Sequence, residues 1–240
     1  MIFGRKNKAE EVDDADIEDI EDVDDTEDLD EDIADEDDEY DFDEEDLDEW
    51  ELFDDSQDWR EDGPFDIDEV ELSGDEVKRI DLGAMIITPE NGMTIKLVAN
   101  PATQQILHLV VENGPESAVQ ITVLAAPADG SYCTELRGEL IAQTEKATSV
   151  ELVKGPFGTE IRRVITVTDD QGHQGHAPVR DWLISGPRWI LNARLLGKAA
   201  LDTEGTGASE DLKEFVHNII VRRGDAAMMP GAVLPLTPAS

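Results

Sequence analysis

Acidic residues crowd the first third of this 240-residue chain. Residues 1–78 hold 40 Asp and Glu against 5 Lys and Arg, and so carry most of the formal net charge of -40. Carboxylates at this density repel one another. The few apolar residues between them bury too little surface to offset the entropy of ordering the backbone, about 1 to 2 kcal/mol per residue. The sequence therefore predicts a long disordered acidic N-terminal arm over residues 1–78.

The rest of the chain has a different composition. Residues 79–240 hold 19 acids and 14 bases and are rich in Val, Ile and Leu. A chain of this length can bury about two thirds of its unfolded surface around one core. We expect a single domain over residues 79–225 and a proline-containing C-terminal tail over residues 226–240.

Apolar spacing in that domain predicts its fold. Helical spacing predicts helices near residues 131–147 and 208–217. Alternating apolar residues and turn signals predict strands near residues 79–89, 93–99, 104–112, 117–127, 150–155, 159–169, 177–185, 188–197 and 218–223. Strands that follow one another without helices between them favour antiparallel pairing. We expect an α+β fold, an antiparallel sheet with two helices packed on one face.

Catalytic and metal-binding patterns are missing from the sequence. It contains no Gly-rich phosphate loop, no G-x-S-x-G elbow and no H-E-x-x-H. Cys133 falls on the apolar side of a predicted helix, which favours a buried structural thiol over a nucleophile. His173 and His176 lie beside glycines in a predicted hairpin loop, and no second ligand cluster accompanies them, so a solvated turn is favoured over a metal site. We expect no enzyme activity, no catalytic residue, no metal and no cofactor.

The sequence also predicts a compartment. A lone cysteine forms no disulfide within the chain, and the basic first residues are followed by acids where a signal peptide needs an apolar region. No run approaches the roughly 18 apolar residues of a membrane span. We expect a soluble cytoplasmic protein with no membrane partner.

Candidate interaction residues are of two kinds. Aromatic and apolar residues punctuate the acidic arm, a composition typical of segments that fold on a partner. In the domain, rings and arginines gather near the turns GPFG (155–158) and GPRW (186–189), where arginines that share a face would bind anions and arginines paired with local acids would not. The candidates are Tyr40, Phe42, Leu47, Trp50, Phe53, Trp59, Phe157, Arg162, Arg163, Arg188 and Trp189.

Three separate motifs carry a family resemblance. They are GPFGTE at 155–160, GPRW at 186–189 with GKAA at 197–200, and VRRGDAAMMPGAVLPL at 221–236. On these motifs the chain resembles, from about Arg79 to Pro238, an actinobacterial family known as domain of unknown function 3710, and its basic start and acidic arm also look like that family. This resemblance implies no activity. A weaker resemblance, in the order of elements alone, is to the Mog1/PsbP-like fold, which is used for protein binding.

These observations favour a non-enzymatic protein-interaction or adaptor protein. In this hypothesis the domain docks one partner and the polyanionic arm engages or repels a basic one. The alternative is a small-ligand-binding or enzymatic domain with a pocket between sheet and helices. A weaker alternative is a nucleic-acid-associated regulator gated by its arm. With the arm intact, direct nucleic-acid binding is disfavoured, because a tethered polyanion competes with the phosphate backbone.

Overall fold

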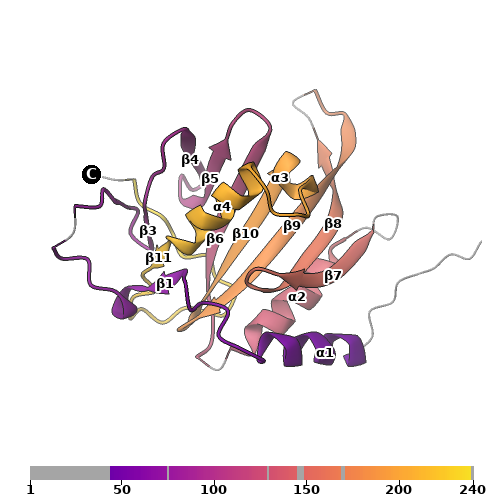
Figure 1. Ribbon diagram of the computed structural model, residues 1–240, viewed down its shortest axis with the longest axis horizontal. Helices are drawn as coiled ribbons and strands as arrows, with labels where there is room; N and C mark the ends of the chain where they lie inside the picture. The colour runs from indigo at the N-terminus through magenta and orange to yellow at the C-terminus, as the bar shows by residue number, and fades with distance from the viewer. Residues whose placement is uncertain (1–43, 75, 129, 145–148, 169–170, 239–240) are drawn as a thin grey trace, which may run out of the picture. The chain divides into compact units, whose positions relative to one another are not determined.

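The computed structural model of the chain describes residues 44–240 except 75, 129, 145–148, 169–170 and 239–240 (Figure 1). Two of the candidate interaction residues, Tyr40 and Phe42, lie outside the described residues. Leu47 lies within the first helix, α1 (Glu44–Asp54).

Seven strands form one antiparallel sheet in the order β4-β5-β6-β10-β9-β8-β7. The strands are β4 (Met93–Ala99), β5 (Ile106–Asn113), β6 (Ser117–Ala125), β7 (Val150–Gly155), β8 (Gly158–Thr168), β9 (Gln174–Gly186) and β10 (Trp189–Gly197). The long strands β8, β9 and β10 lie side by side in Figure 1. The predicted antiparallel sheet is confirmed, and the expected ranges for β4 and β7 match the observed ones.

A second, smaller sheet has the order β1-β11-β3-β2. It contains β1 (Phe65–Asp66), β2 (Ile80–Asp81), β3 (Met85–Ile87) and β11 (Ile220–Val221), with a short 3-10 helix, η1 (Ile67–Glu69), after β1. The structure corrects the expected boundary at residue 78, because α1 and β1 fall inside the range assigned to the disordered arm. Here acidic side chains reach buried donors of the domain, so a high density of carboxylates did not exclude order.

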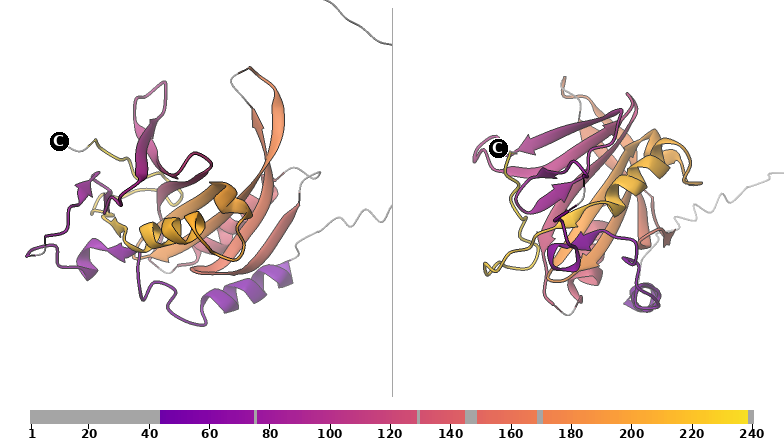
Figure 2. Two further views of the ribbon diagram at one scale, coloured as in Figure 1. Left: turned by 45° about the horizontal axis from the view of Figure 1, so that its top comes forward. Right: turned by 60° about the vertical axis from the view of Figure 1, so that its left-hand side comes forward.

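The helices cover opposite faces of the large sheet, which corrects the expectation that both pack on one face (Figure 2). On one face, α2 (Tyr132–Ala142) packs around Leu183 of β9. On the other, α3 (Lys198–Leu201) and α4 (Ala208–His217) belong to the cluster that contains Ile184 of β9. Consecutive strand residues point to opposite faces. Since β9 is buried without interruption over Val179–Ile184, both faces need a cover.

The C-terminal segment is also part of the fold, contrary to its assignment as a tail. Leu234 and Leu236 are 2% and 5% exposed. The backbone N–H of Leu234 donates to the carbonyl oxygen of Val123 at 2.8 Å, and that of Leu236 donates to the carbonyl oxygen of Ile106 at 3.1 Å. Prolines prevent a continuous strand here, but the apolar residues between them still fill the core. Among the helices of the described residues, none has the length and apolar content to cross a membrane.

Candidate functional site

The last residue of α1, Asp54, ties the acidic part of the chain to the domain. Its Oδ2 pairs with Nη2 of Arg137 on α2, whose side chain is 1% exposed. Its Oδ1 accepts hydrogen bonds from the backbone N–H and from Oγ1 of Thr159 on β8, both at 2.7 Å. A buried guanidinium is costly unless a carboxylate compensates it. One carboxylate therefore holds α1 to both α2 and the sheet.

The turn between β7 and β8 is shaped for this contact. Gly158 has a φ of +95°, and a Cβ at this position would lie 2.7 Å from Oδ1 of Asp54. Beside it, Phe157 is buried, and its ring centroid lies 5.2 Å from that of Trp182 and 4.5 Å from that of His217. The motif GPFG thus combines a packing anchor with a glycine that lets the carboxylate approach.

The aromatic residues of α1 and its following loop pack together. The ring centroids of Trp50 and Phe53 are 5.8 Å apart in an edge arrangement, and those of Phe53 and Trp59 are 4.9 Å apart. The Nζ of Lys154 lies 5.1 Å from the Phe53 centroid. The indole Nε1 of Trp59 donates to the carbonyl oxygen of Asp54 at 3.0 Å. These three candidate residues therefore join α1 to the domain.

The second distinctive turn, GPRW, fixes β1 to the large sheet through Trp189. Trp189 is fully buried, and its Nε1 donates to Oδ2 of Asp66 at 2.7 Å. The guanidinium of Arg60 lies 5.3 Å from the centre of the Trp189 ring. A Cβ on Gly186 would lie 2.1 Å from that ring. Arg188, in contrast, is exposed at the tip of the turn with a φ of 64°.

The candidate arginines do not share one face. Arg162 and Arg163 are consecutive on β8 and point to opposite faces of the sheet. The Nε of Arg162 contacts Oε1 of Glu160 at 2.8 Å, and the Nε of Arg163 contacts Oδ2 of Asp181 at 2.9 Å. Both therefore sit in ion pairs with acids of the domain, apart from the exposed Arg188.

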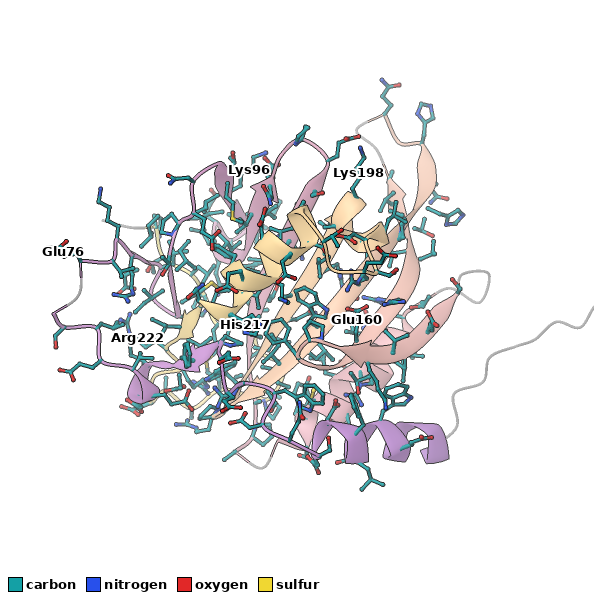
Figure 3. All side chains as sticks on the ribbon, viewed as in Figure 1. Glu76, Lys96, Glu160, Lys198, His217 and Arg222 are labelled. Atoms are coloured by element: carbon teal, nitrogen blue, oxygen red, sulfur yellow. The ribbon has the colours of Figure 1, made fainter. Side chains whose placement is uncertain are left out.

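Two buried carboxylates organise these arginines, and the sequence analysis singled out neither. Glu160, labelled in Figure 3, is 1% exposed and accepts hydrogen bonds from Arg180, Arg162 and the indole of Trp182. Burial acts to raise the pKa of Glu160, but the hydrogen bonds from Arg180, Arg162 and Trp182 outweigh it and hold the pKa below its ordinary value. Asp181 on β9 is fully buried. An acid close to arginines within a strand was the available signal.

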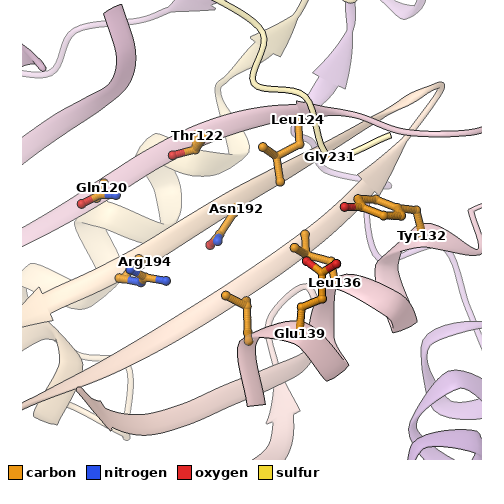
Figure 4. Close-up of a pocket in the computed structure, with 10 residues that line it drawn as sticks. Gln120, Thr122, Leu124, Tyr132, Leu136, Glu139, Asn192, Arg194 and Gly231 are labelled. Carbon is orange, nitrogen blue, oxygen red and sulfur yellow. The ribbon is translucent and has the colours of Figure 1, made fainter. Parts of the chain in front are cut away.

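A pocket of about 260 Å³ opens between α2 and the sheet (Figure 4). The sequence had suggested a pocket between sheet and helices, and this one is lined by both polar and apolar side chains. Its lining residues come from β6, β10, α2 and the C-terminal segment: Gln120, Thr122, Leu124, Tyr132, Leu136, Glu139, Leu140, Asn192, Arg194 and Gly231.

The structure also places the cysteine and the two loop histidines that the sequence raised as candidates. Burial raises the pKa of the Cys133 thiol to about 11, and its Sγ lies 3.9 Å from the carbonyl oxygen of Leu183. Such a thiol is a poor nucleophile at neutral pH. Among the described residues, no three His, Cys, Asp or Glu side chains come together as metal ligands. His173 and His176 are exposed near the hairpin between β8 and β9.

Comparisons with known proteins identify a family but give no activity. The family described as "Protein of unknown function (DUF3710)" matches residues 63–240, a range that starts earlier than the expected Arg79 and includes β1. No curated protein matches the chain.

Two solved structures are similar at low identity. A crystal structure from Bacteroides thetaiotaomicron has 10% identity and a TM-score of 0.34, and the match covers 60% of this chain and 47% of that one. The chain thus matches about half the length of that structure. The solution structure of cyanobacterial PsbP (CyanoP) from Synechocystis has 9% identity and a TM-score of 0.29, with 63% and 96% covered. The resemblance to the PsbP-like fold is weak, and we transfer nothing from either structure.

Proposed function

The chain belongs to the family described as protein of unknown function (DUF3710), and we propose that it is a non-enzymatic interaction protein, or adaptor, of the cytoplasm. In this proposal the folded region carries a polyanionic N-terminal segment to a basic protein partner. The support comes from how the charges of the chain are distributed and paired.

Negative charge is concentrated directly ahead of α1. Residues 1–43 contain 23 Asp and Glu against 3 Lys and Arg. A segment of this kind attracts cationic surfaces over distances set by the ionic strength, about 10 Å at 0.1 M salt. It therefore binds whichever accessible cations are not already neutralised.

The observation that carries the proposal is that most of the domain's arginines are already held in ion pairs. In the described part of the chain, most guanidinium groups pair with a carboxylate of the same region. The pairs are Arg60–Glu69, Arg137–Asp54, Arg162–Glu160, Arg163–Asp181, Arg180–Glu160, Arg194–Asp181 and Arg222–Asp81. The attraction exerted by residues 1–43 is thus left for another molecule.

The contact at Asp54 supports the adaptor part of the proposal. Because Asp54 is held by Arg137 and Thr159, α1, which follows residues 1–43 in the chain, is fixed to the domain. A partner bound by residues 1–43 would therefore be tethered to the folded region.

The test compares the full-length chain with a full-length variant in which every Asp and Glu of residues 10–43 is replaced by Asn or Gln. A matched control replaces exposed acids of the folded region, Glu71, Glu76 and Glu116, by Gln. Binding of a lysine-rich peptide is measured by fluorescence anisotropy at rising salt, and proteins retained from cell extract are compared by quantitative pulldown.

We expect peptide affinity to fall steeply with salt, and basic proteins to be lost from the N-terminal variant but kept by the control. Equal retention by all three proteins would contradict the proposal. Binding of DNA or RNA that appears only in the N-terminal variant would favour a nucleic-acid regulator instead.

A further inference from the structure

One buried carboxylate, Asp181, faces two guanidinium groups on the α2 side of the sheet. Its Oδ2 contacts Nε of Arg163 at 2.9 Å, and its Oδ1 contacts Nε of Arg194 at 2.7 Å. Among the described residues, this cluster has two positive charges and one negative charge. The single carboxylate balances one of the two guanidinium charges, so the cluster favours a further anion.

Of the two arginines, Arg194 is the one that lines the pocket, so the excess positive charge lies on that side. Arg163 is enclosed, with its Nη1 donating to the carbonyl oxygen of Leu140 at 2.8 Å, whereas the Arg194 side chain is 21% exposed and lines the pocket. In the described part of the chain, no acceptor is recorded for the two Nη atoms of Arg194. Burial, together with the charge of Arg194, lowers the pKa of His108, so this neighbour stays neutral at pH 7. Paired guanidinium N–H groups suit a carboxylate, which they bind in a bidentate manner.

Asn192 also lines the pocket and carries an unsatisfied acceptor. Oδ1 of Asn192 is buried and has no hydrogen-bond partner among the described residues. A buried acceptor without a donor is unfavourable, so a ligand N–H at this point is stabilising. Asn192 and Arg194 lie two residues apart on one face of β10, about 7 Å between their Cα atoms.

The other end of the pocket has one carboxylate and an apolar wall. Glu139 and Tyr132 project from α2 on the side opposite Arg194 (Figure 4). No ion pair is recorded for Glu139 in the described range. Leu124 and Leu136 supply an apolar wall beside them. The pocket is thus positive at one end and negative at the other, with an amide between.

We propose that this pocket binds a small zwitterion of the amino-acid class, with its carboxylate on Arg194, its ammonium group between Asn192 Oδ1 and Glu139, and its side chain against Leu124 and Leu136. The volume of about 260 Å³ lies below the range of typical drug-sized sites, which limits the ligand to this size. The proposal is independent of the polyanionic segment, because none of the residues that line the pocket belongs to residues 1–43.

The experiment uses the full-length chain and ligand-observed NMR with the common amino acids at about 10 mM, which detects even a Kd of about 1 mM. Each amino acid that binds is then compared with its amide, which lacks the carboxylate, and with its N-acetyl form, which lacks the ammonium. We expect at least one apolar amino acid to bind, and both derivatives to bind at least about 10-fold more weakly, a loss of about 1.4 kcal/mol.

Substitutions at the two ends of the pocket test which ligand group each end binds. Arg194→Gln should abolish the preference for the acid over the amide, and Glu139→Gln should reduce the preference for the free amine over the N-acetyl form. Glu135→Gln, on the exposed side of the same helix, should change neither. No binding by any amino acid overturns the proposal, as does equal binding of an amino acid and its amide. Because that comparison uses the unaltered protein, it holds even if Arg194→Gln fails to fold.

Discussion

Asp54 at the end of α1 compensates the buried guanidinium of Arg137 on α2, across 83 positions of the chain. The acidic segment thereby supplies a charge that the domain needs. The same carboxylate receives two hydrogen bonds from Thr159. An acidic stretch that the sequence assigned to a disordered arm is therefore part of what stabilises the fold.

The first prediction concerns this ion pair. Asp54→Ala leaves Arg137 buried without its carboxylate, and removing one partner of a buried pair typically costs 3 to 5 kcal/mol. Because the Asp54 side chain is 25% exposed, we expect the lower end, about 3 kcal/mol, in the free energy of unfolding measured with urea. The control is Asp55→Ala, next to it and exposed, which should change the stability by less than about 0.5 kcal/mol. Equal effects of the two substitutions would refute the role of the pair.

A second prediction separates backbone strain from the contact with Asp54. Gly158→Ala places a methyl group 2.7 Å from Oδ1 of Asp54 in a left-handed conformation. Gly92→Ala meets a similar φ of +91° but nothing within 4 Å. Both substitutions should lower the free energy of unfolding by at least roughly 1 kcal/mol, the cost typical of backbone strain. Gly158→Ala should lower it further, because its methyl group also meets Asp54.

The readout for Gly158→Ala is the total tryptophan emission, to which Trp50 and Trp59 contribute beside the buried Trp182 and Trp189, together with urea unfolding. Displacement of α1 should change the emission of Trp50 and Trp59, which pack on either side of Phe53. Gly92→Ala should leave the emission unchanged. An identical loss of stability in both variants, with no change in emission, would show that the close approach of Asp54 has no energetic consequence.

Local patterns in the sequence predicted elements well. The range of α4 was predicted from apolar residues at helical spacing, Leu212, Phe215 and Val216, and all three are buried. The range of β7 followed from apolar alternation before the turn at Pro156. Such patterns report which side of an element is buried, and that is a local property.

Long-range pairings could not be read in the same way. Nothing near Asp54 indicates Arg137, and nothing near Asp181 indicates both Arg163 and Arg194, because a carboxylate pairs with whichever cation the fold brings close. The side of the sheet that each helix covers was likewise not encoded in the helix itself. It depends on the buried run Val179–Ile184 of β9, whose two faces both need a cover.

A third prediction concerns pH and Glu160. Burial acts to raise the pKa of this carboxyl. The hydrogen bonds from Arg180, Arg162 and Trp182 outweigh burial and hold the folded-state pKa below its ordinary value of 4.5. Its stabilising contribution is therefore complete above pH 4.5 and is lost as the pH falls through the depressed folded-state pKa. Glu160→Gln should be less stable than the natural chain at pH 7, by about 3 kcal/mol.

The expected signature is a difference in stability between the natural chain and Glu160→Gln that narrows as the pH is lowered from 5 toward 3, measured by urea unfolding at each pH. Charge repulsion in the acidic segment changes equally in both proteins and cancels in the difference. Glu151→Gln is the control, because Glu151 is exposed and lies 4.0 Å from Arg162. A difference that stays constant with pH would mean that folding does not lower the pKa of Glu160.

The last prediction tests whether the C-terminal segment belongs to the core. Leu234 is 2% exposed and its backbone bonds to Val123 of β6, so Leu234→Ala should cost about 2 to 4 kcal/mol through lost burial and the cavity left behind. Met229 lies in the same segment but is 79% exposed, so Met229→Ala should be nearly neutral. Both variants keep the prolines, which isolates side-chain packing from backbone effects. A neutral Leu234→Ala in urea unfolding would mean that residues 226–240 are an appended tail, whereas the predicted loss of stability would show that the fold extends beyond residue 225.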